Sequence, residues 1–228
     1  MSIFATMAGE AKKDPPISMR DTLFGDSPVD DWTGNGSLSQ AFPWNAFVLG
    51  RARIRRGYRE AAIANWLEVI NQPGLEPRHY LQAWQFLRQS GYHPPADIAR
   101  QVLGVVVEVG MPQGLDLVAA YPDHSARYYN FSGRGVVWEH PNDSLNAKIE
   151  ALLEASTRVV AQIGPWNKPR PPAPPPNHVR LNFLTPSGLH FGQADIEVMS
   201  RDPIGGEVFF RAGELMQAMV ALTGPKRP

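Results

Sequence analysis

The sequence predicts an α+β protein in which a small N-terminal helical unit precedes an antiparallel sheet with helices packed on its face. Three observations lead to this prediction. Large apolar residues recur at helical spacing between residues 43 and 91. Short β-branched and aromatic runs separated by turn residues follow between residues 105 and 138. A long amphipathic stretch at 145–163 then precedes two more such runs, and the short turns favour antiparallel neighbours.

Composition excludes several classes of protein. The chain has 228 residues, 43% of them hydrophobic, which is enough apolar material for a packed core. Its 22 basic and 22 acidic residues give a net charge of zero, which disfavours a globally basic nucleic-acid binder. The absence of cysteine excludes disulfides, thiolate metal sites and cysteine nucleophiles. We find no apolar run of about 18 residues and no secretory leader, so we expect no membrane span and take the cytoplasm as the default location.

The first 42 residues predict an irregular acidic tail. Proline, glycine and aspartate clusters favour turns here, yet Leu23, Phe24 and Trp32 lie among the acids. Large apolar residues in an acidic segment are typical of sequences that dock on a protein surface. Two alternatives remain at this point: the tail packs on its own chain, or it binds an outside partner.

Residues 43–95 predict a helical unit. Pro43 suits the first position of a helix, and Pro73 with Gly74 ends a second helix. Pro77 begins a third helix, which Gly91 ends. The spacing of the apolar residues puts one buried stripe on each helix.

The segment 46–74 resembles a single tetratricopeptide repeat. Leu49 and Gly50 stand where that motif has Leu-Gly, Ala62 follows twelve residues later, and Trp66 takes the place of the usual Phe. Two positions depart from the pattern, because Ala and Arg replace the motif's Trp and Tyr. The resemblance implies a protein-interaction scaffold, and a lone repeat needs support from the third helix and the following domain.

An arginine stripe runs through the first two predicted helices. Arg51, Arg55 and Arg59 recur every four residues, with Arg53 and Arg56 adjacent. Like charges at this spacing cost about 0.2–0.5 kcal/mol per pair in an isolated helix, so local stability does not explain them. Three interpretations remain: a solvated helix face, a contact with an acidic partner, or a contact with nucleic-acid phosphate. The acidic partner is another protein, another copy, or the tail itself through Asp26, Asp30 and Asp31. Zero net charge makes nucleic acid the weakest of the three.

Residues 96–228 predict the α+β domain. A short helix is expected at 97–103, a proline-rich crossover at 165–176 and a last helix at 208–219. The crossover also matches a basic-x-x-Pro-x-x-Pro recognition pattern. The predicted strands are 105–109, 115–121, 127–131, 136–138, 179–184 and 189–193. This order is loosely similar to that of profilin-like and roadblock-like interaction domains, on element order alone.

The search for chemistry yields only scattered candidates. If residues 110–114 form a hairpin loop, Glu108 faces Asp116 across two strands, and Arg127 and Tyr129 share that face. His190 lies just after a turn, without a second histidine at helical spacing. Phosphate loops, dinucleotide fingerprints and nucleophile elbows are absent. We therefore predict no metal and no cofactor, and keep these five residues as an alternative ligand-binding or hydrolase-like site.

The leading hypothesis is a non-catalytic protein–protein interaction or scaffolding protein, such as a subunit of a larger assembly. Its predicted partner-binding residues are the arginine stripe and the apolar anchors of the tail. The partner is expected to be another protein or another copy of the chain. The lack of an assembled catalytic constellation weighs against an enzyme.

Overall fold

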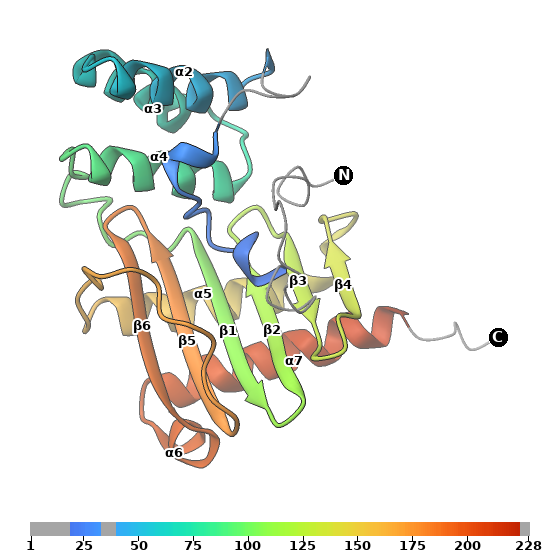
Figure 1. Cartoon of the computed structure of the whole chain (residues 1–228). Helices are drawn as coiled ribbons and strands as arrows, with labels where there is room; N and C mark the ends of the chain where they lie inside the picture. The colour runs from blue at the N-terminus through green and yellow to red at the C-terminus, as the bar shows by residue number, and fades with distance from the viewer. Residues whose placement is uncertain (1–18, 33–39, 224–228) are drawn as a thin grey trace.

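The computed structural model describes residues 19–32 and 40–223, and it has the predicted α+β architecture (Figure 1). Three helices are followed by a six-stranded antiparallel sheet, with further helices on one of its faces. The rest of the predicted tail, at residues 1–18 and 33–39, lies outside the described residues. The elements are η2 (Val29–Asp31), α2 (Trp44–Arg55), α3 (Arg59–Asn71), α4 (Pro77–Gln89), β1 (Gly104–Met111), β2 (Gly114–Ala120), β3 (Ala126–Tyr129), β4 (Gly135–Trp138), η4 (Asp143–Leu145), α5 (Asn146–Val160), β5 (His178–Thr185), β6 (Gly188–Asp195), α6 (Ile196–Arg201) and α7 (Gly205–Thr223).

The helical unit consists of α2, α3 and α4, as predicted. A helix break at Gly57, whose φ is +81°, separates α2 from α3 and places Arg59 on the second helix. Gly50 of α2 lies against the indole of Trp66 on α3, where a Cβ atom would come within 2.2 Å of the ring nitrogen. The close packing of the two helices therefore requires glycine at this position. Phe47 and Phe86 complete the aromatic core of the unit.

The sheet has the strand order β4-β3-β2-β1-β5-β6, and every neighbouring pair is antiparallel. Strands β1 to β4 form the predicted meander. The hairpin β5–β6 returns to the other side of β1, so β1 lies in the middle of the sheet beside β2 and β5. This topology brings residues from both halves of the domain onto the two faces of β1.

The predicted register of the first hairpin is wrong by one residue. The loop is the two-residue turn 112–113, closed by the pair Met111 and Gly114, and not the predicted five-residue loop. Glu108 therefore pairs with Leu117, while Asp116 pairs with Val109. Because side chains alternate along a strand, Glu108 and Asp116 point to opposite faces, and the predicted carboxylate pair does not exist.

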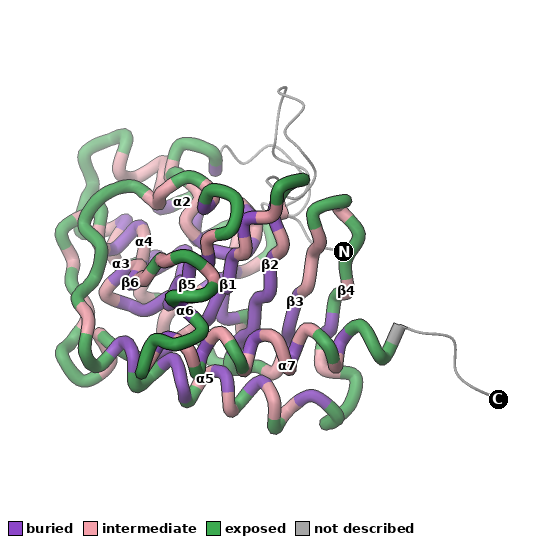
Figure 2. Tube along the Cα trace, turned by 90° about the horizontal axis from the view of Figure 1, so that it is seen from below, coloured by how far each residue is buried: buried purple, intermediate pink, exposed green. Residues whose placement is uncertain are grey.

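Helices α5 and α7 cover one face of the sheet (Figure 2). Apolar residues at helical spacing on both helices pack on alternate residues of β1, β2 and β5. The buried residues of this face include Val105, Val107, Val118, Leu181, Phe183, Ile149, Leu152, Val208 and Leu215. This face is closed by regular secondary structure.

Two irregular segments and α4 cover the opposite face, which we call the open face. Residues 19–27 lie over β1 and β2, and the proline-rich tract at 165–176 crosses β5 and β6 (Figure 1). The tract runs from β6, where Trp166 N–H donates to the Leu189 carbonyl, to the end of β1, where Asn177 N–H donates to the Gly110 carbonyl. Pro174, one of the two prolines of the recognition pattern, is buried in this tract.

Two other details of the domain differ from the prediction. Residues 97–103 form turns and coil instead of a helix, while the short helix α6 was not predicted. The helical unit packs on the sheet through α4, which contributes Leu81 to the cluster on the open face and Phe86 to the helical core. Because α4 serves two cores, nine of its 13 residues are buried.

Candidate protein-interaction site

Part of the N-terminal tail lies across the open face of the sheet and continues along α4 toward α2 (Figure 1). We call residues 22–32 the tail segment, and the side chains that hold it the docking surface. The docking surface comprises Phe47, Arg51 and Arg55 of α2, Gln82 and Phe86 of α4, Tyr121 after β2, and Arg170 of the proline-rich tract.

Side chains of the docking surface bind the main chain of the tail segment. The Gln82 carboxamide accepts a hydrogen bond from Ser27 N–H (3.1 Å) and donates one to the Ser27 carbonyl (2.9 Å). The Tyr121 hydroxyl donates to the Leu23 carbonyl (2.6 Å), and burial raises the pKa of Tyr121, which keeps it a donor. These bonds are independent of the side chains of the tail segment. They hold it in the way a bound peptide is held, without adding it to the sheet.

The three apolar anchors of the tail segment are buried in their own chain. Leu23 and Phe24 pack against the open face of the sheet. Trp32 packs edge-on against Phe47 and Phe86, with ring centroids 4.7 and 6.3 Å away. Of the two alternatives for the tail, the structure favours packing on its own chain. The partner-binding prediction required these anchors to be exposed, but all three are buried.

The acidic end of the tail segment contacts the arginine stripe. A carboxylate oxygen of Asp30 accepts hydrogen bonds from Nε (3.2 Å) and Nη2 (2.8 Å) of Arg55. The same oxygen lies 3.9 Å from Nε of Arg51. Asp30 and Arg55 are both more than half exposed, so the pair contributes at most about 1 kcal/mol. The contact supplies position and charge complementarity more than stability.

The other arginines of the stripe have separate partners. Arg53 donates to the Ala61 carbonyl and to Asn65 of α3, and Arg59 donates to the Ser90 carbonyl. Arg56 is exposed and makes no hydrogen bond or ion pair with the described residues. The stripe is therefore not a continuous unpaired cationic surface of the kind that phosphate backbones require.

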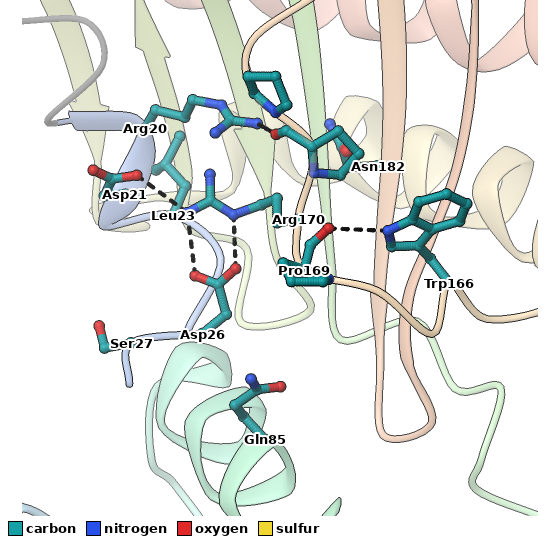
Figure 3. Close-up of polar contacts among 12 residues, drawn as sticks. Arg20, Asp21, Leu23, Asp26, Ser27, Gln85, Trp166, Pro169, Arg170 and Asn182 are labelled. Carbon is teal, nitrogen blue, oxygen red and sulfur yellow. Dashed lines mark hydrogen bonds and ion pairs between the residues drawn. The ribbon is translucent and has the colours of Figure 1, made fainter. Parts of the chain in front are cut away.

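Arg170 joins the tail segment to the proline-rich tract. Its guanidinium donates to Asp26 (2.7 Å) and Asp21 (3.1 Å) (Figure 3). It also lies over the Phe24 ring. Burial disfavours the charged form of Arg170, but Asp26 and Asp21 outweigh it and raise its pKa above the ordinary arginine value. The predicted partner of the acidic tail was the stripe, whereas Asp26 binds this arginine instead.

A charged network lies beneath the tail, on the open face of β1 and β5. Glu108 is fully buried and accepts hydrogen bonds from Arg20 and from Nδ2 of Asn182, and Arg180 lies 3.6 Å from it. Arg20 also donates to the Pro171 carbonyl, and Arg180 to the Pro172 carbonyl. Glu108 is thus the counter-ion of two buried arginines, and its lone pairs are engaged in structure.

The other residues of the alternative ligand site do not converge on Glu108. Asp116, on the opposite face, accepts from Phe131 N–H (2.8 Å) and the Tyr128 hydroxyl (3.2 Å). Arg127 and Tyr129 share the face of Glu108, as expected from their strand positions, but they lie two strands away on β3. Arg127 donates to the Trp138 carbonyl and to Glu139 there.

His190 is buried on the helix-covered face. Its Nδ1 contacts the Ile163 carbonyl (3.2 Å), and its Nε2 contacts the Ser187 hydroxyl (3.1 Å). Burial lowers the pKa of His190, so the imidazole is neutral at pH 7 and suited to act as a base. The Ser187 N–H donates to the Ala99 carbonyl, however, and is not available to an oxyanion. The histidine therefore stabilises the β5–β6 turn.

Sequence reasoning missed Gln82, Tyr121 and Arg170. Two sequence signals point to Gln82 and Arg170 in hindsight. A glutamine lies between apolar residues on the buried side of a helix, and a single arginine interrupts a run of prolines beside an acidic tail. Buried polar groups need partners, and the tail supplies them.

The described residues contain no group of three or more histidine, aspartate or glutamate side chains arranged to hold a metal ion. In the same part of the chain, every helix is too short or too polar to cross a bilayer. No protein-family model matches the chain, and no curated protein or solved structure shows significant similarity to it.

Proposed function

We propose that the protein is a non-catalytic protein–protein interaction or scaffolding protein. The docking surface carries the proposal. Its side chains recognise a polypeptide segment by main-chain hydrogen bonds at Ser27, a carboxylate contact at Asp30 and an aromatic contact at Trp32. These are the kinds of contact by which interaction domains bind peptides. The resemblance of α2 and α3 to a tetratricopeptide repeat agrees with this role.

The placement of the candidate catalytic residues supports the same proposal. Glu108 and His190 lie on opposite faces of the sheet, and each is engaged by neighbours that stabilise the fold. A reaction needs its acid, base and nucleophile within hydrogen-bond reach of one substrate. We therefore do not favour the hydrolase-like alternative, nor nucleic-acid binding through arginines that are largely paired.

Affinity purification of the full chain tests the proposal. Wild-type protein is expected to retain a stoichiometric protein partner, and the double variant Arg51→Glu/Arg55→Glu to lose it. Arg56→Glu is the matched control, because it makes the same charge change at an exposed position without a described ion pair. A wild-type protein that stays monomeric and retains no partner under chemical cross-linking contradicts the proposal.

A further inference from the structure

We infer that the docking surface also accepts, in trans, an acidic segment of another protein with an aromatic residue two positions after the acid, and that residues 27–32 are its internal competitor. This inference rests on the proposed function and specifies the chemistry of the partner. The ligand is defined by the contacts that the chain's own segment makes.

Three subsites define what fits. The Gln82 carboxamide takes the N–H and C=O of one residue whose main chain is not paired elsewhere. Arg55 takes a carboxylate three residues later, at the position of Asp30. The rings of Phe47 and Phe86 then take a large aromatic side chain two residues further on. Between the first two subsites the segment passes through Pro28 and the single turn η2.

The internal ligand leaves part of the docking surface unused. Nε of Arg51 is buried and has no hydrogen-bond partner among the described residues, and the nearest carboxylate oxygen of Asp30 lies 3.9 Å from it. A glutamate is one methylene longer than an aspartate and reaches both arginines from the same main-chain position. A buried donor without an acceptor is unfavourable, so a ligand that satisfies it gains affinity over the internal segment. We therefore expect glutamate to be preferred at this subsite.

The contacts of residues 27–32 are of a kind that exchanges. Side chains make them, no strand pairing or disulfide adds to them, and the Asp30–Arg55 pair is exposed. The internal segment nevertheless has the advantage of a covalent tether, equivalent to a local concentration on the order of millimolar. An outside ligand therefore binds with its intrinsic affinity multiplied by the fraction of molecules whose docking surface is free of the internal segment.

Fluorescence anisotropy with a labelled synthetic peptide of residues 24–32 tests the inference on the full chain. Asp30→Lys places a cation against Arg55 and weakens the internal ligand. We expect this variant to bind the peptide roughly tenfold more tightly than wild type does, equivalent to about 1.4 kcal/mol. Asp31→Lys is the matched control, since Asp31 is an exposed neighbour without a described ion pair, and it is expected to bind as wild type.

A second set of variants identifies the subsite. Adding Arg55→Glu to Asp30→Lys restores an internal ion pair with reversed charges and is expected to abolish peptide binding. Adding Arg56→Glu instead is expected to leave it unchanged. A peptide with glutamate at the position of Asp30 is expected to bind about three- to tenfold more tightly than the parent peptide, as one satisfied hydrogen bond gives. Circular dichroism confirms that each variant is folded.

The inference fails if Asp30→Lys binds the peptide no more tightly than wild type, or if Arg56→Glu weakens binding as much as Arg55→Glu. If affinity purification still captures a partner in that case, the proposed function is retained and only the inference is wrong. Conversely, peptide binding without any captured partner supports the recognition chemistry and contradicts the proposed function. The two failures are therefore distinguishable.

Discussion

The two faces of the sheet are closed in different ways. On one face, α5 and α7 cover alternate apolar residues of the strands and form one hydrophobic cluster with them. On the other, an irregular tail and a proline-rich tract cover the buried Glu108 and Arg180 of the strands, and the tail contributes the buried Arg20. An irregular segment over a sheet needs polar partners for its main chain, whereas a helix pairs its own main-chain groups.

The proline-rich tract shows why the partners are arginines. Proline has a carbonyl but no N–H group, so a buried proline run presents acceptors and no donors. Arg20 and Arg180 supply donors to the carbonyls of Pro171 and Pro172, and Glu108 neutralises part of their charge. The network thus joins β1, β5, the tail and the tract into one unit.

Among the variants that test this difference between the faces, Glu108→Ala is expected to lower the free energy of unfolding most. It leaves Arg20 and Arg180 buried without their counter-ion, which is expected to lower the free energy of unfolding by about 3–5 kcal/mol. Urea denaturation followed by circular dichroism measures the loss. Glu154→Ala is the control, because Glu154 and its partner Arg158 are both exposed and solvent screens the pair. A loss from Glu108→Ala as small as that of the control would show that the open face is not held by its charges.

Leu152→Ala tests the helix-covered face. Leu152 of α5 is fully buried in the hydrophobic cluster, and its truncation is expected to lower the free energy of unfolding by about 2–5 kcal/mol. Leu153→Ala is the control, since Leu153 is only half-buried on the same helix. Equal losses from the two variants would mean that the helix does not pack in this orientation.

The same contrast explains how much could be predicted from the sequence. The helix-covered face could be predicted, because the apolar residues of α5 recur at helical spacing and those of the strands alternate. The open face could not be predicted, because the partners of Glu108 lie 88 and 72 residues away in segments without periodicity. The one-residue error at residues 112–113 also has a local cause, since Gly110 and Gly114 both suit turns. This register error led to the wrong prediction that Glu108 and Asp116 form a pair.

Gln82→Leu tests how the tail segment is held. The change removes both hydrogen bonds to the main chain of Ser27, and is expected to lower the free energy of unfolding by about 1–3 kcal/mol. Amide hydrogen exchange should at the same time increase at residues 22–32 and stay unchanged in α7. Gln89→Leu, at an exposed position of α4, is the control. Exchange that increases equally in α7 would contradict a local role for Gln82.

His190→Asn tests the helix-covered face through pH. Burial lowers the pKa of His190 below 6.5, although the Ile163 carbonyl opposes this effect, so the unfolded chain binds more protons near pH 6. Stability therefore falls as the pH decreases from 7, by at most about 1.4 kcal/mol per pH unit for one group. The variant is expected to show a flatter dependence of unfolding free energy on pH between 7 and 5. His79, whose pKa burial also lowers, contributes equally to both proteins. Parallel curves would show that His190 does not titrate differently on unfolding.

Asp30→Ala has the smallest expected effect on stability and the most specific one on the tail. Both members of the Asp30–Arg55 pair are more than half exposed, so the free energy of unfolding is expected to fall by less than about 1 kcal/mol. High salt should reduce this difference further, because exposed charges are screened. Asp31→Ala, without a described ion pair, is expected to change stability less than Asp30→Ala at low salt and equally at high salt. If the two variants have the same stability at low salt, the arginine stripe does not hold the tail. The part of the tail segment near α2 would then not be held by charge at all, in contrast to the part on the sheet.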